Sequence, residues 1–385
     1  MARVKDLWFK TVKGPDGNPT RVPTVRHGHG KRWLACWTGP TGRETTKAFA
    51  RKQEAADHSN AMEADRLRGV YVDAREGRVK LQEYGKTKWL PAQVHLREGS
   101  TDTYDTHLRS RIYPALGDRR MNGITRSDMK AFVSGLASDL KPSTVHTVFA
   151  VIRSLMQSAV DDGVIPANPC SRVPLPRIEP RVVEPLPVSA VLALVETITP
   201  RYKLAVWLAA GLGLREGEAL GLTVSKVDFL RRRVHIHRQM QKGILSPLKT
   251  KASKRTVPAD DLVLTEITAH MQKFTPGSHE VLITNRCRRP VKRSSFWSCW
   301  ADAVEGAGLP KGTRFHDLRH FYASSLIRAN LNPKVIQSRL GHATISETMD
   351  TYGHLFPDDE DLGRGAIESM IIPALPEQQR NREAT

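Results

Sequence analysis

The sequence predicts a multidomain, mostly helical protein with a small α+β N-terminal domain, an all-α middle domain and a mostly α (α+β) C-terminal domain. Three observations lead to this prediction. The chain has 385 residues, more than one typical domain, and its 39% of hydrophobic residues can supply several cores. Short strand-like pieces occupy the first 70 residues, whereas apolar residues at helical spacing dominate the rest. A proline-rich stretch, 168–183, has the composition of an interdomain linker.

The N-terminal domain, residues 1–70, is predicted to contain three strands and a helix. The strand-like pieces are Asp6–Val12, Arg32–Thr38 and Thr45–Phe49. The sequence Gly-Pro-Thr-Gly at 39–42 predicts a turn between the last two. A helix-like run follows from about Arg51 to Arg68, and Gly69 is a natural helix stop.

The middle domain, residues 78–175, is predicted to be all helical. The clearest helix runs from Ser143 to Val160, with a Pro-Ser-Thr start and Gly163 beyond its end. Its apolar residues fall on one helical face, which indicates core packing rather than a binding site; they are Val145, Val148, Ile152, Leu155, Met156 and Ala159. Another helix is predicted from about Ser100 to Ile112, ending before Pro114.

The C-terminal domain, residues 184–365, combines helices with a short strand pair. The apolar run 204–214 predicts a buried helix that ends near Arg215. Strand-like pieces at 232–239 and 255–258 flank a polar loop that contains Lys249, and later helices carry His316 and Tyr352. A tail, 366–385, begins with a short apolar patch.

Five residues of the C-terminal domain have the types needed to break a phosphodiester without metal: Arg215, His316, Arg319, His342 and Tyr352. Two guanidiniums can hold the charge that develops on the non-bridging oxygens of a pentacoordinate phosphate. A tyrosine hydroxyl is a weak nucleophile at its ordinary pKa of about 10, so it needs proton-handling groups nearby. The two histidines are candidates for that task, and Lys249 is the candidate acid for the departing sugar oxygen.

Each of these residues taken alone has a simpler explanation. An arginine at a helix end usually forms a surface ion pair, and Glu216 or Glu218 could be its partner. His316 and His320 have the i, i+4 spacing of metal ligands on a helix, but the zinc-protease signature requires glutamate where Asp317 stands. We therefore expect no metal and no cofactor. Independent structural roles would rarely produce all five residues in this order, and this favours the catalytic interpretation.

The ordered motifs resemble the tyrosine recombinases of the phage integrase family. They are Gly-Leu-Arg-Glu-Gly-Glu (213–218), the Lys-Thr pair at 249–250, His-Asp-Leu-Arg-His (316–320), Leu-Gly-His (340–342) and Asp-Thr-Tyr-Gly-His (350–354). The resemblance implies that Tyr352 is the nucleophile, with Glu218 supporting the arginines. It assigns phosphate binding to Arg215, Arg319 and His342. Proton transfer is assigned to His316, and protonation of the leaving group to Lys249. Lys251 and Lys254 crowd the same loop as Lys249 and remain alternatives for the acid.

Composition agrees with a polyanionic partner. Lys and Arg number 59 against 40 Asp and Glu, a net charge of +19. A dense basic loop at 285–293 supplies candidate DNA contacts: Arg286, Arg288, Arg289, Lys292 and Arg293. The aromatic residues after it, Phe296, Trp297 and Trp300, are expected to be core. We expect no membrane span or signal segment, a location in the host cytoplasm or nucleoid, and four reduced cysteines.

The resemblance also implies a mode of action. We expect a site-specific recombinase that integrates and excises a phage or mobile element through a 3′-phosphotyrosine intermediate. It would act as a homotetramer on double-stranded DNA, with residues 1–70 binding arm sites and 78–175 binding core sites. A DNA-bending host factor and an excisionase are possible further partners. The alternatives are a cellular resolvase of chromosome dimers, a type IB topoisomerase-like enzyme, and a DNA-binding regulator without catalytic activity.

Overall fold

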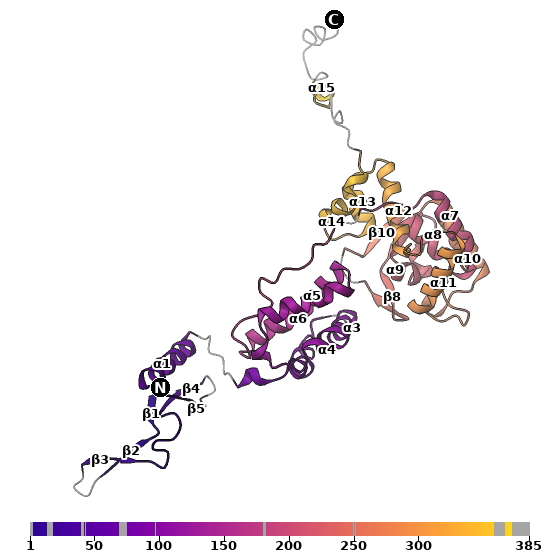
Figure 1. Ribbon diagram of the computed structural model, residues 1–385. Coiled ribbons are helices and arrows are strands. Elements are labelled where there is room, and N and C mark those ends of the chain that lie inside the picture. Colours follow the sequence, from indigo (N-terminus) through magenta and orange to yellow (C-terminus); the bar gives the residue numbers. More distant parts are fainter. Residues whose placement is uncertain are drawn as a thin grey trace. The chain divides into compact units, whose positions relative to one another are not determined.

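The computed structural model describes residues 3–13, 18–39, 42, 44–68, 75–96, 98–179, 182–248, 250, 252–357 and 366–371 (Figure 1). The chain divides into two compact units, Met1–Glu179 and Pro180–Thr385. The boundary between them falls inside the proline-rich stretch 168–183. The finer division into domains 1–70, 78–175 and 184–365 with a tail 366–385 stays a prediction.

The first unit begins with five short strands, where the sequence suggested three. They are β1 (Arg3–Asp6), β2 (Phe9–Lys13), β3 (Pro19–Pro23), β4 (Trp33–Thr38) and β5 (Glu44–Phe49). The prediction of one strand over Asp6–Val12 was wrong, because the chain bends at Leu7 and Trp8. There, Asp6 Oδ1 accepts hydrogen bonds from the backbone N–H groups of Trp8 and Phe9, at 3.0 and 3.3 Å.

These strands form two small antiparallel sheets. In the larger sheet β4 lies between β1 and β5, and β2 pairs with β3 in a separate hairpin. Helix α1 (Lys52–Leu67) agrees with the predicted range and packs on β4. Ser59 of α1 donates a hydrogen bond to the carbonyl oxygen of Cys36 at 2.9 Å. The core here is small and is built around Ala35, Trp37 and Ala55.

The rest of the first unit is helical. Its α-helices are α2 (Leu81–Tyr84), α3 (Glu98–His107), α4 (Tyr113–Leu116), α5 (Arg126–Asp139) and α6 (Pro142–Asp161). All six residues of the predicted apolar stripe on α6 are buried. The prediction that Pro114 ends a helix was wrong. A π-helical turn, Leu108–Ile112, leads directly into α4, and Pro114 stands in the first turn of α4, where a missing N–H is tolerated.

The second unit is mostly helical with small sheets. Its helices are α7 (Val188–Thr197), α8 (Lys203–Leu212), α9 (Glu216–Leu220), α10 (Asp261–Lys273), α11 (Arg293–Gly306), α12 (Phe315–Arg328), α13 (Pro333–Leu340), α14 (Ile345–Tyr352) and α15 (Ala366–Ile371). Its strands are β6 (Val227–Asp228), β7 (Arg233–Ile236), β8 (Arg238–Gln241), β9 (Ile244–Pro247) and β10 (Arg255–Pro258). Strand β7 lies between β6 and β10, and β8 and β9 form a hairpin.

Helix α8 is the centre of the second unit. It is apolar over most of its surface and contacts α7, α10 and α12 (Figure 1). Helix α13 in turn contacts α12, α14 and β10. Because α8 is buried in the core, the residues that follow it are held firmly, and this positions the site described below.

Two further expectations concern the whole chain. None of the described helices combines the length and the apolarity needed to cross a membrane. All four cysteines are free thiols; Cys36 and Cys170 are buried, whereas Cys287 is exposed.

Candidate active site

Arg215 stands three residues after the end of α8, near a helix end as the sequence predicted, and it also begins a further helix, α9, which the sequence did not indicate. Helix α8 ends at Leu212 because Gly213 adopts a left-handed conformation (φ 64°). A β-carbon on Gly213 would lie 2.5 Å from the Tyr322 ring, so only glycine fits here. The chain then enters α9 with Arg215 as the N-cap residue.

Glu218 is a buried carboxylate between two guanidiniums. Its Oε2 accepts a hydrogen bond from the Arg215 backbone N–H, and its Oε1 accepts one from Arg215 Nη1, both at 3.0 Å. Arg255 donates to the same carboxylate through Nη2 at 2.9 Å and Nη1 at 3.2 Å. Burial alone would raise the pKa of Glu218, but Arg255 and then Arg215 outweigh it and lower the pKa to about 2. The group is therefore ionised at neutral pH.

Arg319 is almost fully buried, with 1% of its surface exposed. Its Nη1 donates to the carbonyl oxygen of Gly213 at 2.7 Å, and its Nη2 donates to that of Leu340 at 2.5 Å. The buried Nε has no hydrogen-bond partner in the described part of the chain. Burial, and then repulsion from Arg215 and Arg255, lower the pKa of Arg319, yet a guanidinium stays charged at neutral pH.

His316 lies one turn before His320 on α12 and is exposed at the surface. Partial burial removes water from the His316 ring, which disfavours its protonated form. That form is also repelled by His320, Arg319 and Arg215. Together these effects lower the pKa of His316 to about 4. At pH 7 His316 is therefore a neutral imidazole, and its side chain is open to solvent.

His342 follows Gly341, which ends α13 in a left-handed conformation. Its Nδ1 is 2.9 Å from the Thr348 hydroxyl oxygen, and Nε2 is 3.7 Å from Glu347 Oε1. Burial, followed by repulsion from Arg319 and Arg215, lowers the pKa of His342 to about 3. At neutral pH it is thus a neutral imidazole, and its contact with Glu347 is not an ion pair.

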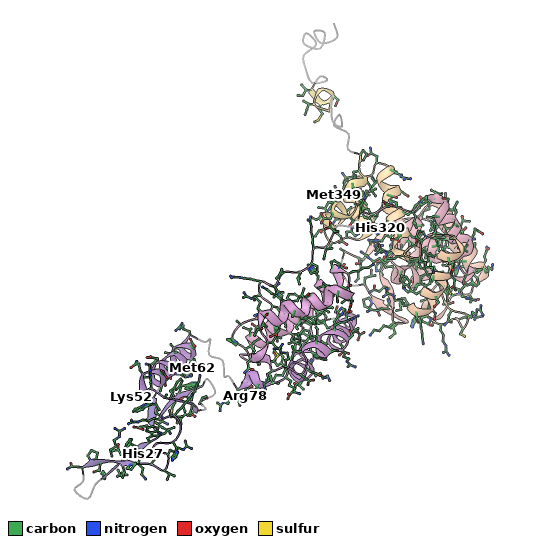
Figure 2. The ribbon with its side chains drawn as sticks, viewed as in Figure 1. His27, Lys52, Met62, Arg78, His320 and Met349 are labelled. Carbon is green, nitrogen blue, oxygen red and sulfur yellow. The ribbon has the colours of Figure 1, made fainter. Side chains whose placement is uncertain are left out.

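Tyr352 ends α14 and is 1% exposed. Its hydroxyl oxygen is 2.9 Å from Nδ1 of His320, which Figure 2 labels in the second unit. The ring of His342 lies parallel to the tyrosine ring, with centroids 6.4 Å apart. Burial raises the pKa of Tyr352 to about 12, although Arg319 and Arg215 oppose the shift. The nucleophile candidate is therefore a protonated phenol in this structure.

The structure brings together six of the seven residues proposed for the site from sequence: Arg215, Glu218, His316, Arg319, His342 and Tyr352. Lys249 lies outside the described residues. Sequence reasoning missed two residues that the structure adds, Arg255 and His320. The spacing of His320 from His316 was noticed, but only as a metal motif. In the described part of the chain, no cluster of three or more potential metal ligands is present.

Comparison with known proteins identifies the family. Residues 183–358, which contain this whole constellation, match the sequence model described as "Phage integrase family". This segment of the chain belongs to that family. The chain is accordingly a tyrosine recombinase, a site-specific integrase.

Relatives and solved structures extend the likeness beyond that segment. The integrase of Mycobacterium phage FRAT1 is 29% identical over 299 residues, which is 75% of this chain and 88% of the relative. The Tn1549 transposon integrase in complex with a circular intermediate DNA has a TM-score of 0.64 at 19% identity, covering 76% of this chain and 99% of that one. A lambda integrase tetramer bound to a Holliday junction has a TM-score of 0.58 at 18% identity, covering 84% and 93%. The two structures share the fold.

The basic loop of this integrase lies close to the candidate site. Asn285 organises it as a turn, accepting hydrogen bonds at Oδ1 from the backbone N–H groups of Cys287 and Arg289. All five candidate DNA-binding side chains are exposed. Arg293, which begins α11, is 3.7 Å from Glu216, the residue after Arg215. Phe296 and Trp300 are core residues as predicted, whereas Trp297 is partly exposed.

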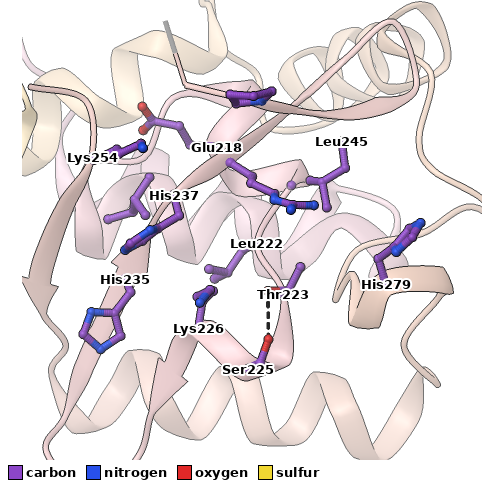
Figure 3. Close-up of a pocket in the computed structure, with 14 residues that line it drawn as sticks. Glu218, Leu222, Thr223, Ser225, Lys226, His235, His237, Leu245, Lys254 and His279 are labelled. Atoms are coloured by element: carbon purple, nitrogen blue, oxygen red, sulfur yellow. Dashed lines mark hydrogen bonds between the residues drawn. The ribbon is translucent and has the colours of Figure 1, made fainter. Parts of the chain in front are cut away.

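A basic cavity adjoins Glu218 (Figure 3). Its volume is about 460 Å³, and the hairpin β8–β9 contributes to its wall through Arg238, Leu245 and Pro247. Its charged and titratable lining, apart from Glu218, is Lys226, His235, His237, Arg238, Lys254 and His279. Burial, and then Lys226, His235 and Lys254, lower the pKa of His237. A concave surface with this lining favours an anionic group.

Proposed function

We propose that this integrase cleaves DNA with Tyr352 and rejoins it through a covalent 3′-phosphotyrosyl link, so as to integrate or excise a phage or mobile element. The observation that supports this most strongly is the placement of one buried tyrosine hydroxyl among cationic groups. Arg319 and Arg215 both favour the ionised form of Tyr352, which means that both act on the oxygen that would attack phosphorus.

In this proposal Arg215 and Arg319 bind the scissile phosphate. The unpartnered Nε of Arg319 is a buried donor that a non-bridging oxygen can satisfy. Glu218 fixes the Arg215 side chain, which is still one-third exposed and can reach a ligand. His316 and His342 are neutral in the free protein, and the negative charge of a phosphate would raise the pKa of both.

The reaction balances without an external energy source. The tyrosine hydroxyl gives up its proton to a basic group of the site as its oxygen forms a bond to phosphorus, the bond from phosphorus to the 5′ oxygen breaks, and that oxygen takes a proton from an acid. We assign the acid to Lys249, on the basis of its Lys-Thr context alone. The freed 5′-hydroxyl of one duplex then attacks the phosphotyrosyl bond of the other and restores the phosphodiester.

The active assembly is proposed to contain four protomers on two duplexes, with strands exchanged in pairs. The lambda integrase tetramer on a Holliday junction supports this, because its fold covers most of the present chain. Helix α15 exposes Ile367 and Met370, and such an apolar surface suits docking on a neighbouring protomer. We assign core sites to the helices of the first unit, arm sites to residues 1–70, and direction to a DNA-bending host factor and an excisionase.

Covalent trapping tests the proposal. The full-length protein is incubated in EDTA with nicked duplexes taken from the flanks of its own genomic locus, and a protease-sensitive, gel-retarded adduct is sought. We expect an adduct with the native protein and none with Tyr352→Phe. Bound duplex without any adduct would contradict the proposed chemistry and favour a DNA-binding regulator. Relaxation of supercoiled DNA that carries no such site would favour a topoisomerase.

A further inference from the structure

His320 contacts the reacting atom of the proposed nucleophile, and neither the sequence motifs nor the mechanism above gives it a task. Its Nδ1 is 2.9 Å from the Tyr352 hydroxyl oxygen, and both residues are buried. The two rings meet edge to face, with centroids 5.6 Å apart and an interplanar angle of 65°. A buried, protonated hydroxyl needs an acceptor, so the tyrosine O–H donates to Nδ1 and the imidazole proton resides on Nε2.

His316, the residue first expected to handle this proton, is placed differently. It is exposed on α12, one turn before His320, and its ring packs against that of His320 with centroids 4.8 Å apart. In the described part of the chain, it makes no hydrogen bond to Tyr352. The two histidines therefore face different partners: His316 is open to an incoming phosphate, whereas His320 lies behind it against the tyrosine.

We propose that His320 is the general base that takes the Tyr352 proton during attack, an inference that rests on the proposed function. As the bond between the tyrosine oxygen and phosphorus forms, the O–H bond breaks and its proton moves to Nδ1, which gives an imidazolium. The 5′ oxygen leaves with a proton from the separate acid. In the rejoining step the imidazolium returns its proton to the tyrosine oxygen as that oxygen departs.

The surroundings of His320 make this transfer costly without substrate. Arg319 is the next residue in the chain, and the guanidiniums of Arg319 and Arg215 both act on the Tyr352 hydroxyl that His320 contacts, so they would repel an imidazolium there. A bound phosphate supplies the compensating negative charge. The tyrosine is thus held as a protonated phenol until DNA is in place, and the proton moves only when phosphorus is within reach.

The test compares His320→Asn with His320→Phe in single-turnover cleavage of a trapped duplex. Asparagine can present an amide oxygen near the position of Nδ1, so it keeps the hydrogen bond but cannot take the proton. We expect both variants to lose ~10²–10⁴-fold in cleavage rate, the usual contribution of a general base. A rate for His320→Asn within a few-fold of the native rate would overturn the proposal, because His320 would then only position the hydroxyl.

A substrate with sulfur in place of the bridging 5′ oxygen separates base from acid. A thiolate leaves without a proton, so this duplex should rescue Lys249→Ala but leave His320→Asn slow. Rescue of His320→Asn as well would refute the assignment. His270→Asn is the matched control, because His270 is also buried and hydrogen-bonded, to the Leu282 carbonyl, and lies on α10. It should cleave at the native rate.

We expect the His320→Asn variant to bind DNA with native affinity and to have the native melting temperature, but to cleave slowly. If the native protein forms no adduct at all, the proposed function fails. If the native protein forms an adduct and His320→Asn matches it, the assignment of His320 alone fails.

Discussion

Glu218 shows how one side chain can set the charge state of a whole site. It is 2% exposed and pairs with Arg215 and Arg255, while a third guanidinium, that of Arg319, lies close by. Without the carboxylate, three cations would face one another in a medium that screens charge poorly. The carboxylate therefore matters for folding as well as for the position of Arg215.

The effect of Glu218 on stability should depend on pH. Its pKa is lowered from 4.5 to about 2 in the folded protein, so the stabilisation is complete above pH 4.5 and is lost as the pH falls towards 2. A shift of this size corresponds to about 3 kcal/mol. We expect Glu218→Gln to lower the free energy of unfolding by that order at pH 7 in urea titrations, with a smaller difference at pH 3.

Glu216→Gln is the control for that experiment. Burial raises the pKa of Glu216, so its charged form is not favoured by folding. Neutralising it should cost little at pH 7. Equal stability of Glu218→Gln and the native protein at pH 7 would contradict this account of the ion-pair cluster.

The end of helix α13 controls two site residues at once. Gly341 has a φ of +67°, and a β-carbon there would lie 3.0 Å from both the Ala252 carbonyl oxygen and Arg255 Cδ. His342 follows directly. A side chain at position 341 must therefore displace Arg255 or shift the histidine.

Gly341→Ala and Gly308→Ala should differ for this reason. Both glycines have a left-handed conformation, which costs any L-residue ~1–2 kcal/mol. A β-carbon on Gly308 would meet nothing within 4 Å. In single-turnover cleavage we expect a further loss of ~10²-fold for Gly341→Ala alone, since small misplacements of catalytic groups have effects of that size. Equal losses in cleavage for both variants would show that crowding at α13 is unimportant.

Element by element, the sequence was informative where a local pattern decides the structure. The stripe on α6 and the helix α1 are examples, because helical periodicity alone determines which face is buried. Pro114 was misjudged because a π-helical turn shifts the hydrogen-bond register before it. The end of α8 near Arg215 was predicted from the apolar run, but the turn at Gly213 was not, because it depends on a close approach to Tyr322, a contact distant in sequence.

The candidate site shows the same division. The motif residues could be proposed from the sequence because their order along the chain carries the signal. Arg255 and His320 were missed because their importance lies in partners 37 and 32 residues away, namely Glu218 and Tyr352. The assignment of Lys249 stays a prediction, because it lies outside the described residues.

At the scale of the whole molecule, the net charge of +19 should appear as strong salt dependence of DNA binding. Each phosphate contact contributes a slope of about −0.9 to the plot of log affinity against log salt concentration. If the exposed loop side chains bind phosphates, replacing Arg286, Arg288 and Arg289 together by glutamine should reduce the slope by about 2 to 3. Arg328→Gln, an exposed change at the end of α12, should leave the slope unchanged.

The two hydrogen bonds of Arg319 make its proposed role in cleavage depend on the folding of two helices. Because Arg319 donates hydrogen bonds to the carbonyl groups of Gly213 and Leu340, at the ends of α8 and α13, its guanidinium is held in position only while both helices are folded. If Arg319 binds the phosphate as proposed, a copy in which α8 or α13 has unfolded should still bind DNA through its net charge but should not cleave it. As the denaturant concentration rises, we expect cleavage activity to be lost at or before the concentration at which the amides of α13 lose their protection from hydrogen exchange. DNA binding should persist to higher concentrations than either signal. The enzyme would then lose its cleavage activity before it unfolds completely.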